Sequence, residues 1–348
     1  MASLARPFVM AALVAVLASP ALGQSAGAAL ARSSDGRPSF DGVWTNASST
    51  KLERPQTMRQ LVVPKSDADA MEKAALAGAK AAGAPSDLSA GAFRDSNSGA
   101  GYNAFWTDPG FGLMKVRGEA RSSYIIEPED GRIPFRDRAK SLAETMREGA
   151  EYRSGQGAYE GPEVLPLRER CLISQSDGGG PVMLNGLYNN NYEFHLTTNY
   201  LVIEVEMVHD ARIFPIYRDA ATARAAHKPA AIKPWLGDSV AWWEGDTLVA
   251  ETRNLNQIQA AHTSTPLSPE GTVTERFTRI ETGELLYQFR VDDPVHYTKA
   301  WSGEYAFKPG KGALYEYACH EGNYSVPGIL RGARLKEAQV ANPAHLKP

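Results

Sequence analysis

The chain has 348 residues, 43% hydrophobic and 22% charged, a composition that excludes an intrinsically disordered protein and supplies apolar side chains for one large or two smaller domains. Its formal net charge is -3 and its sequence pI about 6.2, so it lacks the basic footprint of a nucleic-acid-binding protein. We therefore expect a globular protein that does not bind nucleic acid.

The first residues have the order of a secretory signal peptide. Arg6 precedes an apolar run at residues 8–17, and small residues at 21–23 precede Gln24. This predicts a signal peptide over residues 1–23 and a mature domain over residues 24–348. No later stretch approaches the roughly 20 apolar residues of a membrane-spanning helix, so we expect no integral membrane segment and a periplasmic or secreted protein.

The two cysteines, Cys171 and Cys319, are far apart in the sequence. In an oxidising compartment, such a pair favours a disulfide. Closing so long a loop would stabilise the fold by roughly 4 to 5 kcal/mol through the entropy of the unfolded chain. The alternative is a pair of buried thiols.

The first predicted strand lies at residues 40–45, where Gly42 and Trp44 stand two apart. This opening resembles that of lipocalin-like barrels, in which the tryptophan plugs the closed end. Residues 66–82 predict a surface helix with Ser66 as N-cap, and apolar residues within 139–150 recur at helical spacing. With the glycine-rich loop between them, these segments predict a helical and loop insertion at about residues 66–155.

From about residue 155 onward the pattern is almost entirely strand and turn. Residues 199–207 alternate apolar and polar side chains, and 247–253 follow a turn at Glu244, Gly245 and Asp246. A second hairpin is predicted at 272–280 and 285–292, with further strands at 296–307 and 314–320. We therefore predict a mainly β fold: a closed antiparallel lipocalin-like β-barrel with a few peripheral helices and long N-terminal loops, since closure removes exposed edges.

A set of short motifs carries a wider resemblance, covering roughly residues 40–334. They are YNNNY at 188–192, HDARI at 209–213, WLGDS at 235–239, WEGDTLV at 243–249, ERFTR at 275–279, DDP at 292–294 and YEYACHEGNY at 315–324. As a set they resemble a family of exported bacterial proteins of uncharacterised function. The resemblance implies a periplasmic location and brings no activity.

The chain shows no pattern for a cofactor or a metal. The glycine-rich run at residues 178–181 lacks the Lys-Ser/Thr ending of a P-loop, and no dinucleotide fingerprint links a strand to a helix. The seven histidines show no metal-ligand spacing. Ser239 stands in a segment that superficially resembles a hydrolase elbow but reads as a turn between strands. We expect neither cofactor nor metal.

The candidate catalytic residues are ionisable groups on strands or strand ends. His209 continues the alternation that puts the apolar side chains of residues 201–207 on one face of the strand. Its imidazole would then lie at the rim of an apolar pocket, where it could act as a general acid or base. Glu206 has the opposite parity and would join the same site only through a bulge near Asp210. The full candidate set is His209, Glu206, Glu275, Arg212 and His320, with Tyr192, Trp235, Trp243, Tyr297 and Trp301 as ligand-binding aromatics.

Three readings of function stay open. In the first, acid and base residues in a barrel cavity carry out an isomerisation, elimination or hydrolysis on a small, partly aromatic or cyclic apolar molecule, with arginine or tyrosine stabilising an oxyanion. In the second, the same cavity binds a small hydrophobic ligand without chemistry. In the third, exposed aromatic patches give the protein a structural or envelope-interaction role.

Overall fold

The computed structural model describes residues 30–33, 35–83, 108, 110–143, 165–174, 177–261, 263–322 and 324–341. The predicted signal peptide and most of the helix predicted near residues 139–150 lie outside these ranges.

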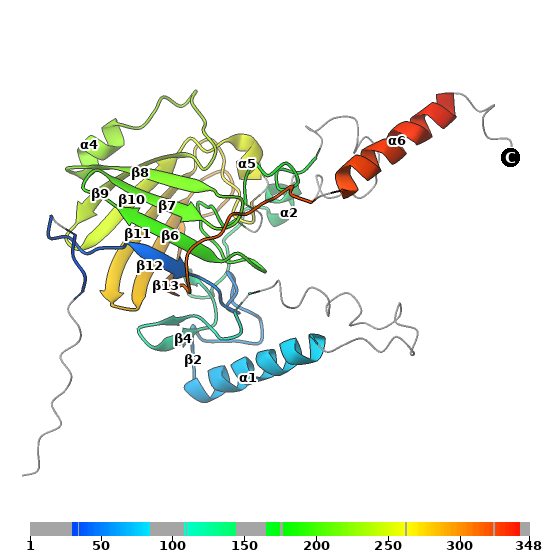
Figure 1. The fold of residues 1–348 in the computed structure, drawn as a ribbon. Coiled ribbons are helices and arrows are strands. Elements are labelled where there is room, and N and C mark those ends of the chain that lie inside the picture. The colour runs from blue at the N-terminus through cyan, green and yellow to red at the C-terminus, as the bar shows by residue number, and fades with distance from the viewer. Residues whose placement is uncertain are drawn as a thin grey trace, which may run out of the picture.

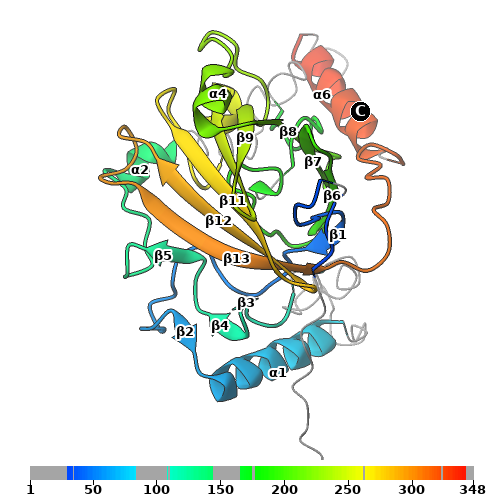
Figure 2. The same cartoon turned by 90° about the vertical axis from the view of Figure 1, so that its left-hand side faces the viewer.

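A ten-stranded sheet forms the body of the protein, and nine of its strands close into a barrel through the pairing of β1 with β13 (Figures 1 and 2). This confirms the predicted mainly β, closed-barrel fold. The strands around the barrel are, in order, β1 (Gly42–Thr45), β6 (Asn191–Leu196), β7 (Tyr200–Val205), β8 (Ala211–Tyr217), β9 (Asp238–Glu244), β10 (Thr247–Arg253), β11 (Thr272–Glu281), β12 (Glu284–Asp292) and β13 (Trp301–Pro309).

One pair of neighbouring strands in this barrel is parallel. β8 and β9 run in the same direction, with Ile216 opposite Ala241 and Tyr217 opposite Trp242, whereas the other neighbouring barrel strands are antiparallel. A closed ring with an odd number of strands requires such a pair. The connection between them contains α4 (Ala220–Ala225), whose N-cap Asp219 accepts a hydrogen bond from the Thr222 N–H at 2.7 Å.

The interior of the barrel is the main hydrophobic core. Along β11 the side chains of Val273, Glu275 and Phe277 are buried while the intervening ones are partly exposed, the period of two expected of a strand with one wet face. Trp44 is buried as well, with the Arg279 guanidinium 4.5 Å from its ring centroid. A large share of the core volume is aromatic. The rings that fill it include those of Tyr192, Phe194, Tyr287, Tyr305 and Phe307.

The N-terminal insertion packs at one end and side of the barrel. β2 (Val62–Val63), β4 (Glu119–Arg121) and β3 (Lys115–Val116) form a small separate sheet, and α1 (Lys65–Ala82) follows β2 along its outside (Figure 2). The N-cap of α1 is Pro64 and makes no side-chain capping bond, so the expected cap at Ser66 is wrong by two positions. β5 (Ile125–Glu127) adds to the edge of β13.

Short helices flank the barrel, and the chain leaves it through a long strap. α2 (Arg138–Ser141) and α5 (Gln257–Ala261) are each about one turn long. After β13, residues 310–322 form the strap, without the strand expected at 314–320, and α6 (Ser325–Ala341) extends away from the barrel (Figure 1).

The predicted disulfide joins Cys171 to Cys319 across 148 positions and is thus confirmed. Every helix in the described ranges is too short or too polar to cross a bilayer.

Candidate functional site

The predicted residues Arg212 and Glu275 meet inside the barrel. The two guanidinium nitrogens Nη1 and Nη2 of Arg212 each lie 2.6 Å from a carboxylate oxygen of Glu275, a bidentate pair with both side chains almost wholly buried. The Tyr287 hydroxyl donates a third short hydrogen bond, 2.6 Å, to Glu275 Oε1. Together these contacts give both oxygens of the Glu275 carboxylate a hydrogen-bond partner.

Burial and the pairing with Glu275 shift the pKa of Arg212 in opposite directions. Burial lowers the pKa of Arg212, but the Glu275 carboxylate outweighs it and raises that pKa overall, which keeps the guanidinium charged. Burial, reinforced by the adjacent Glu275 carboxylate, raises the pKa of Tyr287 well above its ordinary value, so its hydroxyl stays protonated. The central cluster is therefore a fixed ion pair with a neutral donor.

Aromatic rings occupy the space around this pair. The Tyr287 ring centroid lies 4.9 Å from that of Tyr305 and 5.3 Å from that of Phe277. The Tyr192 hydroxyl donates to the Gly178 carbonyl at 3.0 Å and accepts from Asn46 Nδ2 at 3.1 Å. Arg212 and Glu275 thus face each other inside a packed core, and this arrangement stabilises the barrel.

A pocket of about 590 Å³ lies at the end of the barrel. It is built from segments distant in sequence: the stretch after β1, α1, the residues before β5, the loop before β6 and the turn after α5. Its lining comprises Ser48, Ser49, Thr50, Lys51, Leu52, Ala75, Gly110, Phe111, Tyr124, Asp177, Leu184, Asn185, Gly186, Leu187 and Ser264. A mixed apolar wall with a few polar groups at this volume is typical of small-molecule sites.

The polar groups of this pocket are held in place by specific hydrogen bonds. Asp177 Oδ2 accepts from the Ser264 N–H at 3.0 Å and also from the Ser264 hydroxyl. The Tyr124 hydroxyl donates to Asn185 Oδ1 at 2.9 Å, and Asn185 Nδ2 donates to the Ser48 carbonyl at 2.6 Å. Within the described residues, Asp177 Oδ1 and the Lys51 ammonium have no hydrogen-bond partner and are free to meet a ligand.

Burial sets the protonation of two of these groups. It raises the pKa of the Asp177 carboxyl above its ordinary value even though the bonds from Ser264 lower it. It also raises the pKa of Tyr124, which therefore acts as a neutral hydrogen-bond donor. Asp177 has a backbone φ of +61°, a region that aspartate tolerates better than most residues and that is found more often at functional sites. The pocket thus presents a carboxyl group suited to exchanging a proton.

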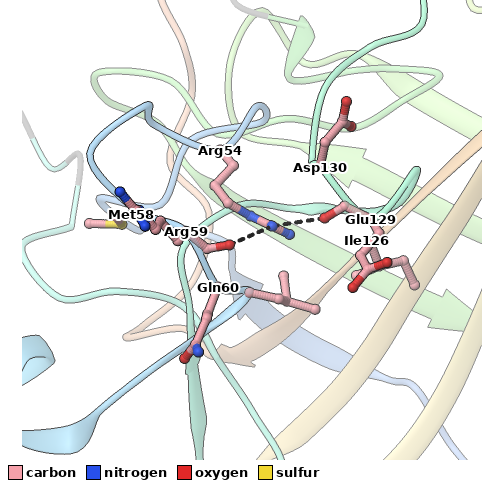
Figure 3. Close-up of a pocket in the computed structure, with 8 residues that line it drawn as sticks. Arg54, Met58, Arg59, Gln60, Ile126, Glu129 and Asp130 are labelled. Atoms are coloured by element: carbon pink, nitrogen blue, oxygen red, sulfur yellow. Dashed lines mark hydrogen bonds between the residues drawn. The ribbon is translucent and has the colours of Figure 1, made fainter.

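A second pocket, of about 650 Å³, lies beside the insertion (Figure 3). Arg54, Met58, Arg59, Gln60, Leu61, Ile126, Glu129 and Asp130 line it. None of the residues predicted from the sequence lines either pocket.

The other predicted acid and base residues lie on the outside of the barrel. β7 ends at Val205, and positive φ values of +65° and +54° at Val208 and His209 form a turn that ends the strand parity before it reaches His209. His209 is exposed, and its Nε2 accepts a hydrogen bond from the Tyr317 N–H of the strap at 2.7 Å. Glu206 accepts from Asn191 Nδ2 at 2.8 Å, and His320 is exposed beside the disulfide.

The predicted aromatic residues are also dispersed. Tyr297 and Trp301 are buried and pack against each other at 5.8 Å between ring centroids, and the Tyr297 hydroxyl donates to the Pro266 carbonyl at 2.8 Å. Trp243 packs on Phe40 at 5.6 Å, and Trp235 is 37% exposed in the connection before β9. Only Tyr192 approaches the barrel-end pocket, through its bond to the Gly178 carbonyl next to Asp177. The structure does not gather these rings around one ligand.

Two groups of potential metal ligands come together among the described residues. Cys171, Cys319 and His320 are close, but both sulfurs are consumed in the disulfide. Glu193 and Glu204 stand opposite each other on β6 and β7 with His195 nearby. Neither group lines a pocket described above, and we assign it no role.

Few features of the sequence point to the residues that form the barrel-end pocket. Asp177 precedes the glycine-rich run at 178–181, which reads as a loop, and its partner Ser264 is 87 positions away. The one available signal was a polar and glycine-rich loop directly before a strand, a common place for binding residues. Comparison of the chain with models of protein families, with curated proteins and with solved structures finds no match.

Proposed function

We propose that this protein is an exported enzyme that processes a small, partly aromatic or cyclic molecule in the barrel-end pocket, with Asp177 as its acid and base. The observation that carries the proposal is a pocket of about 590 Å³ in which one carboxylate oxygen of Asp177 is bonded to Ser264 while the other has no partner among the described residues. This replaces His209 and the barrel interior as the proposed centre of the chemistry.

The chemistry follows from the protonation states. A carboxyl whose pKa is raised by burial can take a proton from a substrate carbon or from water and return it to a neighbouring atom, as isomerisation, elimination and hydrolysis each require. The Lys51 ammonium can stabilise negative charge that develops on a substrate oxygen. Phe111, Leu184 and Leu187 supply apolar contact to a ring.

The proposed location is the periplasm or the extracellular space. A disulfide between Cys171 and Cys319 supports it, because stable disulfides are rare where thiols are kept reduced. The signal-peptide pattern at residues 1–23 points the same way.

The test begins with native mass spectrometry of protein purified from its own host, which identifies a retained molecule by mass. With that molecule or its analogues as substrate, Asp177→Asn should lower turnover by roughly 10² to 10⁴, the usual contribution of a general acid or base. Ser264→Ala, which removes only the hydroxyl that bonds to Asp177, serves as the milder control. Unchanged turnover in Asp177→Asn contradicts the proposal.

A non-catalytic binding protein is the second candidate. It is favoured by the tie between Asp177 and Ser264, which fixes two loops and would suit a purely structural carboxylate. A retained molecule that binds Asp177→Asn as tightly as the unchanged protein, and that neither protein converts, would support this second function.

A further inference from the structure

Arg54 is a buried cation at the floor of the second pocket. Its side chain is only 6% exposed, and its Nη1 donates to the backbone carbonyls of Glu129 at 2.8 Å and Arg59 at 3.3 Å. Figure 3 shows the guanidinium held between these two carbonyls. Two neutral acceptors orient the group but leave its charge uncompensated.

No carboxylate balances this charge among the described residues. Arg54 forms no ion pair there, its buried Nε has no hydrogen-bond partner, and Nη2 has none either. A buried charge without a counter-ion is costly. Nε is covered by the chain at Gly131, so Nη2 is the guanidinium nitrogen left for a ligand carboxylate.

The backbone around Arg54 is shaped to hold it. Gly131 has a φ of +69°, and a Cβ at that position would lie 2.7 Å from Arg54 Cβ and 3.0 Å from Nε. A side chain there would therefore displace the arginine. The Gly131 carbonyl also accepts the Arg54 N–H at 2.9 Å, so the insertion holds this arginine from both its backbone and its side chain.

The surroundings indicate the class of ligand. Met58, Leu61 and Ile126 provide apolar wall in a pocket of about 650 Å³. Glu129 and Asp130 lie exposed at the same pocket, and their negative charge disfavours a multiply charged phosphate relative to a singly charged acid. We propose that Arg54 binds the carboxylate of a small organic acid whose apolar body lies against Met58, Leu61 and Ile126. This site is separate from Asp177 and does not depend on the function proposed for it.

The experiment uses benzoate as the probe, benzamide as its neutral isostere and inorganic phosphate as the alternative anion. Titration calorimetry of the unchanged protein should show binding of benzoate, with benzamide and phosphate much weaker. In proton–nitrogen NMR spectra, benzoate should shift the Arg54 Nε–H signal, a readout that needs no variant.

Two substitutions localise the effect. Arg54→Lys keeps the charge but loses the planar fork, and benzoate binding should weaken about 10- to 100-fold, as expected when hydrogen bonds to a charged group are lost. Arg132→Met removes a positive charge close to Glu129 and Asp130 in the chain but outside the pocket lining, and is the matched control, with a change of less than about threefold. Circular dichroism verifies that both variants fold.

Three results would overturn the proposal. They are an unshifted Arg54 Nε–H signal in the unchanged protein with saturating benzoate, equal binding of benzoate and benzamide, and tighter binding of phosphate than of benzoate. Equal loss of benzoate binding in folded Arg54→Lys and Arg132→Met would overturn it too, because it would show general attraction by positive charge.

Discussion

The interior of the barrel and its pocketed end use the same kinds of residue in opposite ways. Inside, Arg212 Nη1 and Nη2 both bond to Glu275, Tyr287 donates to the same carboxylate, and both charged side chains are almost wholly enclosed by the core. At the barrel end, Asp177 has one oxygen bonded and the other without a partner among the described residues, and in the second pocket the described contacts engage only Nη1 of Arg54. The core encloses the interior pair, whereas Asp177 and Arg54 line pockets that a ligand can enter, so we locate function at the pockets.

A large effect is expected from breaking the interior pair. Arg212→Met should lower the free energy of unfolding by about 3 to 5 kcal/mol, because it leaves Glu275 buried without a counter-ion. Arg276→Met, one position along β11 from Glu275, breaks a half-exposed pair with Glu244 and should cost less than about 1 kcal/mol. Urea unfolding of both variants measures the difference. An equal loss of unfolding free energy in the two variants would mean that the interior pair stabilises the fold no more than the surface pair does.

The disulfide ties the strap to the start of the β-rich part. Replacing Cys171 and Cys319 together by serine should lower the free energy of unfolding by up to about 5 kcal/mol from chain entropy over 148 positions. Limited proteolysis should then cut within residues 310–341 well before the barrel strands. If the barrel were cut first, the strap would be part of the core fold instead of a separate attachment.

The Asp177 carboxyl should make the folded protein less stable as pH rises. Its folded-state pKa is raised, so the folded protein holds the proton more tightly than the unfolded chain does, and stability declines from the ordinary aspartate pKa upward through the raised one. Asp177→Asn removes this decline. The stability of the variant relative to the unchanged protein should therefore improve between pH 4 and pH 7, as measured by urea unfolding. A relative stability that is flat or falls over this interval would contradict the raised pKa.

The smallest effect is expected at His209. Its one described hydrogen bond accepts the Tyr317 N–H, so His209→Ala should cost about 1 kcal/mol or less and speed hydrogen exchange at Tyr317. Turnover of an identified substrate should stay within about threefold of the unchanged protein. A fall of about 10² or more with an intact fold would instead make His209 the acid or base that its strand pattern first suggested.

Local patterns in the sequence were enough to predict the hairpins, the closed barrel and the disulfide. The turn at Gly245 and the hairpin of β11 and β12 follow from side-chain period and turn residues that lie close together in the chain. The parallel pair of β8 and β9 depends on how many strands close the ring, a global property that no short segment encodes. The exposure of His209 depends on two left-handed residues in a turn without glycine.

The pockets could not be predicted for a similar reason. Asp177, Tyr124 and Asn185 come together only after the insertion and the loop before β6 have packed on the barrel end. Arg54 looks like an ordinary surface arginine in the sequence, and its burial depends on Gly131 and on carbonyls at positions 59 and 129. In both cases the functional interpretation depends on which side-chain atoms lack a hydrogen-bond partner and face a pocket, and only the folded structure shows this.

We propose that small molecules bind at the end of the barrel and that its centre is closed to them. The most direct measurement is a crystal structure of the protein soaked with a mixture of small aromatic fragments. We expect fragment density beside Asp177, Tyr124 and Asn185, with Arg212 and Glu275 still paired. Density for a fragment between Arg212 and Tyr287, with the ion pair opened, would contradict the account.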